Sequence, residues 1–438
     1  MRNVWSRARL SAARQEGRYV KLIDREWVSK APKLSHVAPF DGMRGFGILG
    51  VLIGHSFPLE TLSWAGIVDC FFVISGFLIT SLLLQEQRNH GRIDLKKFYA
   101  RRSLRLLPLL YVLLAVVAVA GLIAKMSGLL DGTIYTLNGL AKESVAAGLY
   151  VHNVFYPILT GPWHAHLWTL SVEEQFYLVV GIFMLVGLKR GAIRVVTGLL
   201  VFFIAAIQIS RGFGIVGPFP GPMLAVWVQR PDSLMVGMLC AIVNANLQGP
   251  LTERTKRVLK LGGYIGVVGI FSAVWASTAF TRNQLGVHIK FWPADPNYVK
   301  DTEAAVQGLL NQRGWRLQMP GGPYWLQWGF TACSWSFFLI TLPAFRVKEW
   351  WPNRVMSMKW LVRIGAMLSY GLYVWHYPVQ QFTHLIVGTT NTGIAGDHSR
   401  MDAHPLVQLI LDVGLPFIFA IATYFLVEKK ALELKDRF

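Results

Sequence analysis

Apolar runs of nearly 20 residues recur along the whole chain, and they restrict it to a small set of folds. A helix of this length crosses the roughly 30 Å of hydrocarbon in a bilayer, at about 1.5 Å per residue. Of the 438 residues, 53% are hydrophobic and only 15% are charged, whereas soluble domains carry about 25% charged residues. Because a helix satisfies its backbone polar groups internally, the runs predict an all-α, polytopic bundle of membrane helices.

About ten transmembrane helices are predicted. The expected spans are 41–60, 64–84, 105–124, 168–187, 194–210, 231–247, 261–280, 324–345, 363–386 and 405–427. Basic connectors follow every second span, so ten spans place all of them on one side together with both termini. Short cytoplasmic loops are rich in Lys and Arg, which predicts that this side is the cytoplasm. The same rule explains the net charge of +19, so no nucleic-acid partner is expected.

This topology divides the chain into a basic cytoplasmic tail at 1–39, a transmembrane domain at 40–428 and a cytoplasmic tail at 429–438. The segment 133–155 is apolar enough to be considered a span, but crossing there would invert every later connector. It is therefore predicted to be an interfacial or re-entrant helix on the outer face. The longest outer connector, 281–323, suits a lid or sugar-contacting surface, or an aromatic belt at the lipid headgroups.

Ionisable residues inside the predicted spans are the strongest indication of function, because each costs about 2.5–3.5 kcal/mol at the bilayer centre on insertion scales. The sequence WTLSVEEQFYLVVGIF carries Glu173 and Glu174 little more than one turn after Trp168. The first span places Arg44 and His55 eleven residues apart. That spacing puts them on one helix face, about 16 Å apart along the axis.

Other predicted spans bring polar groups to a similar depth. Asp69 lies near the outer end of the second span, and Arg230 and Asp232 begin the sixth. Tyr373 and His376 share a face of the ninth. Convergence of these groups at one level predicts a polar site in the outer third of the membrane. For each charge considered alone, a structural ion pair is the alternative.

A second cluster begins the third span. Arg101, Arg102 and Arg105 lie at i,i+3 and i,i+4 spacings, which place them on one helix surface. Guanidinium groups match phosphate oxygens in pairs, so the cluster suits a polyphosphorylated cytoplasmic ligand. Ordinary anchoring by the positive-inside rule is the alternative. The three cysteines are far apart in sequence and predict neither a disulfide framework nor a metal site.

Six motifs in order resemble the acyltransferase-3 family of bacterial membrane O-acyltransferases. They are DGMRGFGILGVLIGHS, GIVDCFFVISGFLI, FYARRSLRLLP, HLWTLSVEEQFYL, RPDSLMVGML and LSYGLYVWHYPV, between residues 41 and 379. The resemblance implies an enzyme of the bacterial inner membrane that moves an acyl group from cytoplasmic acyl-CoA to a hydroxyl of an envelope glycan or glycolipid. Acyl-CoA is then a co-substrate, and no tightly bound cofactor is expected. With no appended domain, the chemistry is expected within the membrane core.

The resemblance also implies residue roles. Arg44 and His55 match the essential Arg and His of the family's first helix, and Glu173 matches the carboxylate of a W-S-L-S-V-E motif, with Thr169 in place of Ser. His55 would be a general base or a transient acyl carrier, Glu173 would fix its tautomer, and Arg44 would position the thioester or stabilise oxyanion charge. Candidate contacts to the two substrates are Arg101, Arg102, Arg105, Asp69, Ser75, Glu174, Trp168, Arg230, Asp232, Tyr373 and His376.

Two questions stay open at this level. A proton-coupled secondary transporter could use the same histidines and carboxylates as a relay, although the chain shows no internal repeat and the arginine triplet has no role in such a protein. Glu174 also suits a structural hydrogen bond. Acetyl and succinyl donors fit equally well, as do polysaccharide, glycolipid and small-molecule acceptors.

Overall fold

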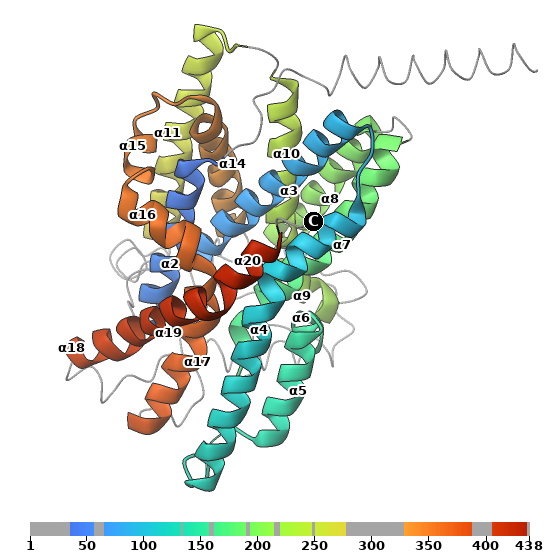
Figure 1. The fold of residues 1–438 in the computed structure, drawn as a ribbon. Coiled ribbons are helices and arrows are strands. Elements are labelled where there is room, and N and C mark those ends of the chain that lie inside the picture. The colour runs from blue at the N-terminus through green and yellow to red at the C-terminus, as the bar shows by residue number, and fades with distance from the viewer. Residues whose placement is uncertain are drawn as a thin grey trace, which may run out of the picture.

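The computed structural model describes residues 36–56, 65–131, 133, 135–156, 162–189, 193–213, 220–247, 250–276, 328–387 and 405–435. All regular structure in these residues is helical, which confirms the all-α prediction (Figure 1). The predicted outer connector 281–323 and most of the N-terminal tail lie outside the described residues.

Long helices form the body of the molecule. They are α2 (Ala38–Ser56), α3 (Val68–His90), α4 (Leu95–Met126), α7 (Trp168–Lys189), α8 (Ile193–Phe213), α10 (Pro231–Asn246), α11 (Glu253–Ala276), α14 (Phe330–Arg346) and α17 (Ser369–Val387). A last run joins α18 (Pro405–Gln408), η6 (Leu409–Gly414), α19 (Leu415–Thr423), η7 (Tyr424–Glu428) and α20 (Lys429–Lys435). Shorter elements are η1 (Ala65–Ile67), α5 (Leu137–Gly148), α6 (His152–Phe155), η3 (Ala165–Leu167), α9 (Pro220–Gln229), α15 (Pro352–Met356), α16 (Lys359–Arg363) and η5 (Ile364–Leu368).

Among the described residues, six helical segments are long and apolar enough to cross a membrane. They are Val68–His90, Leu95–Met126, Ala165–Gly187, Ile193–Phe213, Glu253–Val274 and Leu409–Leu434. The chain is therefore a multi-pass membrane protein. The described residues of the other four predicted spans are also mainly helical, but α10 and α14 have only 16 and 17 residues, and α2 and α17 carry many polar groups. The count of ten spans stays a prediction.

The segment 133–155 does not form one long helix. It is divided into α5, of 12 residues, and α6, of four. At about 1.5 Å per residue, α5 reaches only about 18 Å, which is too short to cross the hydrocarbon. It lies alongside α4 (Figure 1). Both helices are short enough for the interfacial or re-entrant placement that was predicted.

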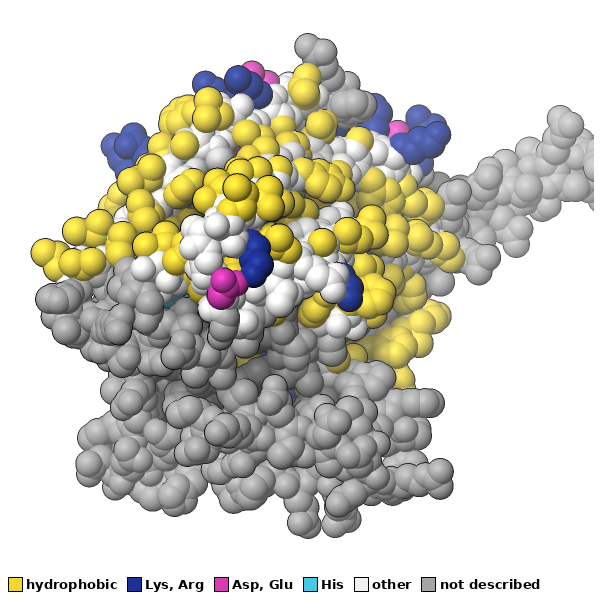
Figure 2. All heavy atoms as spheres, turned by 90° about the horizontal axis from the view of Figure 1, so that it is seen from below, with side chains coloured by type: hydrophobic (Ala, Val, Ile, Leu, Met, Phe, Trp, Pro, Cys, Tyr) yellow, Lys and Arg dark blue, Asp and Glu magenta, His cyan; other side chains and the backbone are white. Residues whose placement is uncertain are grey.

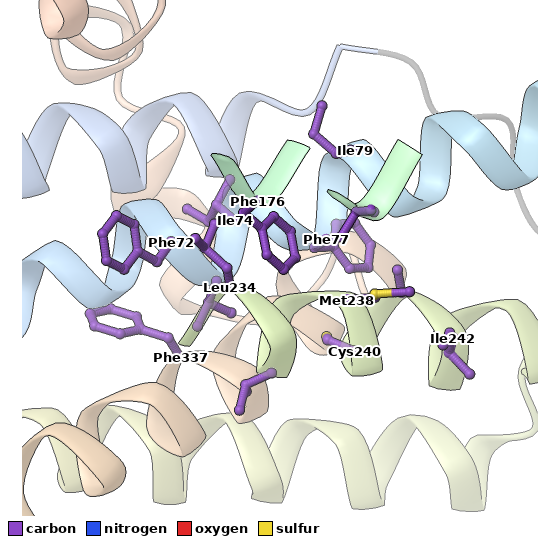
Figure 3. Packing of buried hydrophobic residues seen from close by; sticks show 14 of the residues in the cluster. Phe72, Ile74, Phe77, Ile79, Phe176, Leu234, Met238, Cys240, Ile242 and Phe337 are labelled. Atoms are coloured by element: carbon purple, nitrogen blue, oxygen red, sulfur yellow. The ribbon is translucent and has the colours of Figure 1, made fainter. Parts of the chain in front are cut away.

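In the core, α3 packs closely against α10. A Cβ atom on Gly76 would overlap the carbonyl oxygen of Leu234, and one on Gly237 would overlap that of Val73, so the two backbones touch. Around this contact, buried side chains of α3, α7, α10 and α14 interdigitate (Figure 3). Small residues are what allow such close approach between membrane helices.

Glycine also fixes the position of α2. A Cβ on Gly42 would overlap the backbone of Met356, and one on Gly45 would overlap that of Leu361. The segment α15–α16 therefore lies directly on the first half of α2, and the small glycines of this helix allow that close approach. This contact sets the height of the polar groups that α2 carries.

Exposed apolar side chains cover the outward faces of the long helices. Val119 and Ile123 of α4, Phe202 of α8 and Val268 of α11 are all more than half exposed, at 59%, 61%, 62% and 64%. Figure 2 shows hydrophobic side chains over much of the described surface of one face, with few charged groups among them. Such continuous apolar surface is what lipid covers.

Candidate active site

Three histidines from three separate elements face one another. The ring centroid of His55, at the end of α2, is 5.0 Å from that of His376 in α17. The His376 centroid is 5.3 Å from that of His166 in η3. His376 is fully buried and His166 is only 5% exposed, while His55 is half-buried. We call these residues the histidine array; the proximity of His55 and His376 agrees with the predicted shared depth, whereas His166 was not predicted.

Hydrogen bonds to backbone carbonyls define the tautomer of each ring. Nδ1 of His55 lies 2.9 Å from a carbonyl oxygen of the preceding turn, and Nδ1 of His376 lies 2.7 Å from another. Nε2 of His166 lies 3.1 Å from the carbonyl oxygen of Val374. Because a carbonyl only accepts, each of these nitrogens carries the hydrogen. Nε2 of His55, Nε2 of His376 and Nδ1 of His166 are therefore the acceptor nitrogens.

The tautomer of His55 is thus held by a backbone carbonyl, and the predicted role of Glu173 in fixing it is wrong. Glu173 instead faces the guanidinium groups of Arg102 and Arg44 and the side chains of Tyr177 and Ser75. Since Glu173 follows His166 by seven residues, it lies two helical turns, or about 10 Å, from the histidine array. The carboxylate and the histidines do not share one level.

The arginine triplet divides into one inward and two exposed side chains. The guanidinium of Arg102 stacks on the ring of Tyr177 at 3.7 Å and interacts electrostatically with Glu173 and Glu174. Arg101 and Arg105 are exposed. The predicted single guanidinium surface is therefore incomplete, because Arg102 is used inside the protein.

Arg105 extends the cluster of arginines on α4 toward α2 and the C-terminal helices. Its charge interacts with those of Arg44 and Glu173, and also with that of Glu428 in η7. One carboxylate oxygen of Glu174 is buried and has no hydrogen-bond partner among the described residues. The structural hydrogen bond considered for Glu174 is therefore absent from this part of the chain. We call Arg44, Arg102, Arg105, Glu173 and Glu174 the arginine–glutamate cluster.

Tyr373 and Thr169 connect the two groups. The Tyr373 hydroxyl donates to the carbonyl oxygen of His166, and Oγ1 of Thr169 lies 2.5 Å from the same hydroxyl. Thr169 and Glu173 are four residues apart in α7 and so share a face. The histidine array, these two hydroxyls and the arginine–glutamate cluster form a continuous polar column, built mainly by α2, α4, α7 and α17.

The acidic residues Asp69 and Asp232 are buried in ion pairs. Asp69 accepts from Arg230 at 3.0 Å and from Ser233 at 2.6 Å. Asp232 forms a bidentate pair with Arg211, at 3.2 and 2.9 Å. Every one of these four charged side chains is at most 3% exposed. This arrangement corresponds to the structural alternative rather than to the predicted substrate contacts.

Arg211 was missed because the sequence places it in a connector, whereas α8 continues to residue 213. Two other predicted contacts also have defined neighbours. Trp168 is nearly buried, with its ring 5.4 Å from the guanidinium of Arg230. Ser75 lies beside Glu173 and is half-buried.

Segment 133–155 supports the turn that carries His166. Glu143 of α5 is 1% exposed, and its Oε2 accepts from the backbone N–H groups of Trp163 and His164, at 3.1 and 2.9 Å. The same oxygen lies 3.6 Å from Nε2 of the fully buried His152. None of these residues was predicted, although two histidines in GPWHAHLW directly before a span were a usable signal.

A second buried histidine–carboxylate pair joins α17 to η6. Nε2 of His384 lies 3.2 Å from Asp412, which also accepts from Thr383. Gln380 bridges the backbone of Asp412 and the side chain of Ser56, next to His55. In the part of the chain that the structure describes, no group of three or more His, Cys, Asp or Glu side chains has metal-binding geometry.

Comparison with known proteins adds independent information. The model of the acyltransferase-3 family, described as an acyltransferase domain, matches residues 37–427. O-acetyltransferase OatA of Staphylococcus aureus (strain NCTC 8325 / PS 47) is 29% identical over 354 residues, which cover 78% of this chain and 50% of that protein. A protein of strain COL, provisionally named an O-acetyltransferase, is 27% identical over 414 residues, covering 91% and 58%.

The chain thus spans between 50% and 58% of the length of these relatives. No solved structure matches it. The family match extends over all elements that build the polar column. The chain therefore belongs to the acyltransferase-3 family.

Proposed function

We propose that the chain is a membrane O-acyltransferase that moves an acyl group from acyl-CoA to a hydroxyl of an envelope glycan or glycolipid in the bacterial inner membrane. Family membership and the O-acetyltransferase names of the relatives support the reaction class. One structural observation supports acyl-CoA as the donor and the route of its acyl group. The polar column has the arginine–glutamate cluster at one end and the histidine array at the other.

The donor end is the arginine–glutamate cluster together with Arg101. The exposed Arg105 and Arg101 hold the CoA phosphates, because guanidinium groups pair with phosphate oxygens. Glu173 and the ring of Tyr177 hold Arg102 in place. The phosphopantetheine arm then extends along the polar column toward the histidines.

Arg44 belongs to this donor end. It lies about 16 Å from His55 along the axis of α2, so we place it at the donor end rather than beside the thioester carbon. Its guanidinium is 3.3 Å from Asp41 and interacts with Arg105 and Glu173. The role proposed here is to orient the donor, in place of oxyanion stabilisation at the carbon that His55 serves.

The acceptor end is His55. Its Nδ1–H donates to a carbonyl, so Nε2 has the lone pair that removes the acceptor proton. The acceptor oxygen then attacks the thioester carbon, the carbon–sulfur bond breaks, and the CoA thiolate leaves toward the donor end. A transient acyl group on Nε2 is the alternative order of the same bond changes.

The test uses inverted membrane vesicles from cells that produce the chain, supplied with radiolabelled acetyl-CoA. We expect release of CoA thiol and transfer of the label to vesicle glycan or lipid. His55→Ala should lower both by at least about 100-fold, since general bases contribute about 10²–10⁴-fold.

His90→Ala is the matched control, because this exposed histidine ends α3, away from the polar column. Full acyl transfer by His55→Ala would contradict the proposal. So would proton-driven uptake of a solute without thiol release, which is the behaviour of the transporter alternative.

A further inference from the structure

We propose that His376 and His166 extend His55 into a proton relay that removes the acceptor proton from the reaction centre. The inference rests on the proposed function of His55 and deepens it. His376 and His166 would then be positioning residues for the proton, and neither would contact the acyl group.

The first support is that one nitrogen of each ring has no backbone partner. Backbone carbonyls occupy the other nitrogen of every ring. Nε2 of His376 and Nδ1 of His166 are buried and have no hydrogen-bond partner among the described residues. A buried polar atom left without a partner costs about 1–3 kcal/mol. Two such atoms in adjacent rings indicate a site for a transient hydrogen-bond donor, such as a water molecule or an added proton.

The second support is the spacing. The ring centroids lie 5.0 and 5.3 Å apart, with interplanar angles of 71° and 77°. The remaining nitrogen of each neutral ring is an acceptor, so two of these nitrogens cannot bond to one another directly. One water molecule between two rings would donate one O–H to each, and one added proton would convert a ring into a donor for its neighbour.

Two tyrosines also lie beside the histidine array. Tyr377 stacks on His166 at 5.2 Å, and Tyr373 contacts both His166 and His376. In the described part of the chain, no Asp or Glu forms an ion pair with these three histidines. Among the described residues, no carboxylate therefore traps an added proton on one ring of the histidine array.

The transfer balances in three steps. The acceptor O–H bond breaks as an N–H bond forms at Nε2 of His55. That proton passes through water to Nε2 of His376, which restores neutral His55, and then to Nδ1 of His166. No electron is gained or lost in any step.

The proton leaves His166 by a second histidine group. His164 and His152 interact electrostatically with His166, and the side-chain Nδ1 of His164 and both ring nitrogens of His152 are buried without partners among the described residues. Glu143 beside His152 stabilises the positive charge on the way to water. The CoA thiolate takes its proton from water at the donor end.

The variants remove one nitrogen each and retain the structural hydrogen bond. His376→Asn keeps a donor at the position of Nδ1 and removes Nε2. His166→Gln keeps a donor at the position of Nε2, for the carbonyl of Val374, and removes Nδ1. His384→Gln is the control, because its donor to Asp412 is kept and it lies outside the array.

With acetyl-CoA and the vesicles described above, we expect both array variants to lower kcat at least about 10-fold with KM for acetyl-CoA unchanged. Added imidazole should restore part of the kcat of His376→Asn, because it can carry the missing proton. His384→Gln should retain the wild-type kcat. Wild-type kcat in His376→Asn, or a loss that imidazole does not change, would overturn the relay.

A measurement without turnover separates the relay from the proposed function. In the full chain with ¹⁵N-labelled histidine in lipid bilayers, NMR should show His55, His376 and His166 titrating as one coupled unit. In His376→Asn, His55 and His166 should titrate independently. Independent titration in the wild type would overturn the relay even if His55→Ala abolishes acyl transfer; coupled titration would support it even if acyl transfer is not observed.

Discussion

Asp232 and His376 are both fully buried, but their polar atoms are used differently. Both carboxylate oxygens of Asp232 accept hydrogen bonds, from Arg211 and Gln208, whereas Nε2 of His376 has no partner among the described residues. Burial alone therefore does not distinguish a structural charge from a reactive group. A carboxylate with both oxygens paired fits a structural role, whereas a buried atom without a partner calls for an explanation.

Asp232→Asn tests the structural interpretation. The change leaves the buried guanidinium of Arg211 without its counter-charge, which should destabilise the protein by about 3–5 kcal/mol. The measurement is the thermal unfolding midpoint in detergent. Asp131→Asn is the control, because it breaks an exposed pair with Lys125, 65% and 53% exposed, that should contribute about 0–1 kcal/mol. Equal midpoints for the two variants would contradict the assignment.

Individual site residues were only partly predictable. Arg44, His55 and His376 were identified as candidates from the sequence because ionisable residues are conspicuous within apolar runs. Helical spacing misplaced Glu173, since spacing along α7 does not define the height of α7 relative to α2. It also missed His166, which lies in a short turn whose position depends on Glu143 of another segment.

At the level of helices, the elements that build the candidate site differ from one another in apolarity. α2, α10, α14 and α17 are absent from the six segments that meet the length and apolarity criteria, and α2 and α17 carry His55 and His376. The other two main helices of the polar column, α4 and α7, lie within those six segments, as does His166. α4, α8 and α11 meet the criteria and expose apolar side chains. The polar groups of α2 and α17 lower the apolarity of these helices, so apolarity alone does not identify every helix of the candidate site.

Gly237→Ala tests the backbone contact between α3 and α10. The added methyl group would overlap the carbonyl oxygen of Val73, and overpacking of this kind costs about 1–3 kcal/mol. We expect a lower unfolding midpoint and a smaller yield of folded protein in detergent. Gly198→Ala in α8 is the control, since nothing lies within 4 Å of a Cβ there. An unchanged midpoint in Gly237→Ala would show that the helices can separate.

For the whole molecule, the all-α fold and its multi-pass character were predictable from apolar runs alone. The number of crossings and the orientation rest on the charge of the connectors. Single cysteines can test them, because Cys70, Cys240 and Cys333 are buried, at 2%, 0% and 0% exposure, and should not react.

Asp131→Cys and Arg254→Cys occupy exposed positions on opposite sides of the predicted topology. A membrane-impermeant maleimide should label Asp131→Cys in intact cells and Arg254→Cys only after lysis. Labelling of both variants from outside, or the reverse pattern, would contradict the predicted orientation.

The length of the polar column has a consequence for the choice of donor. About 16 Å along α2 separates Arg44, at the proposed donor end, from His55, the proposed base. An acyl phosphate or acyl adenylate has its carbonyl next to phosphorus and cannot bridge that distance. A thioester at the end of a long flexible arm can. Under the proposed function, the length of the column would therefore select activated acyl donors by the reach of their acyl group, before any contact with the acyl chain itself.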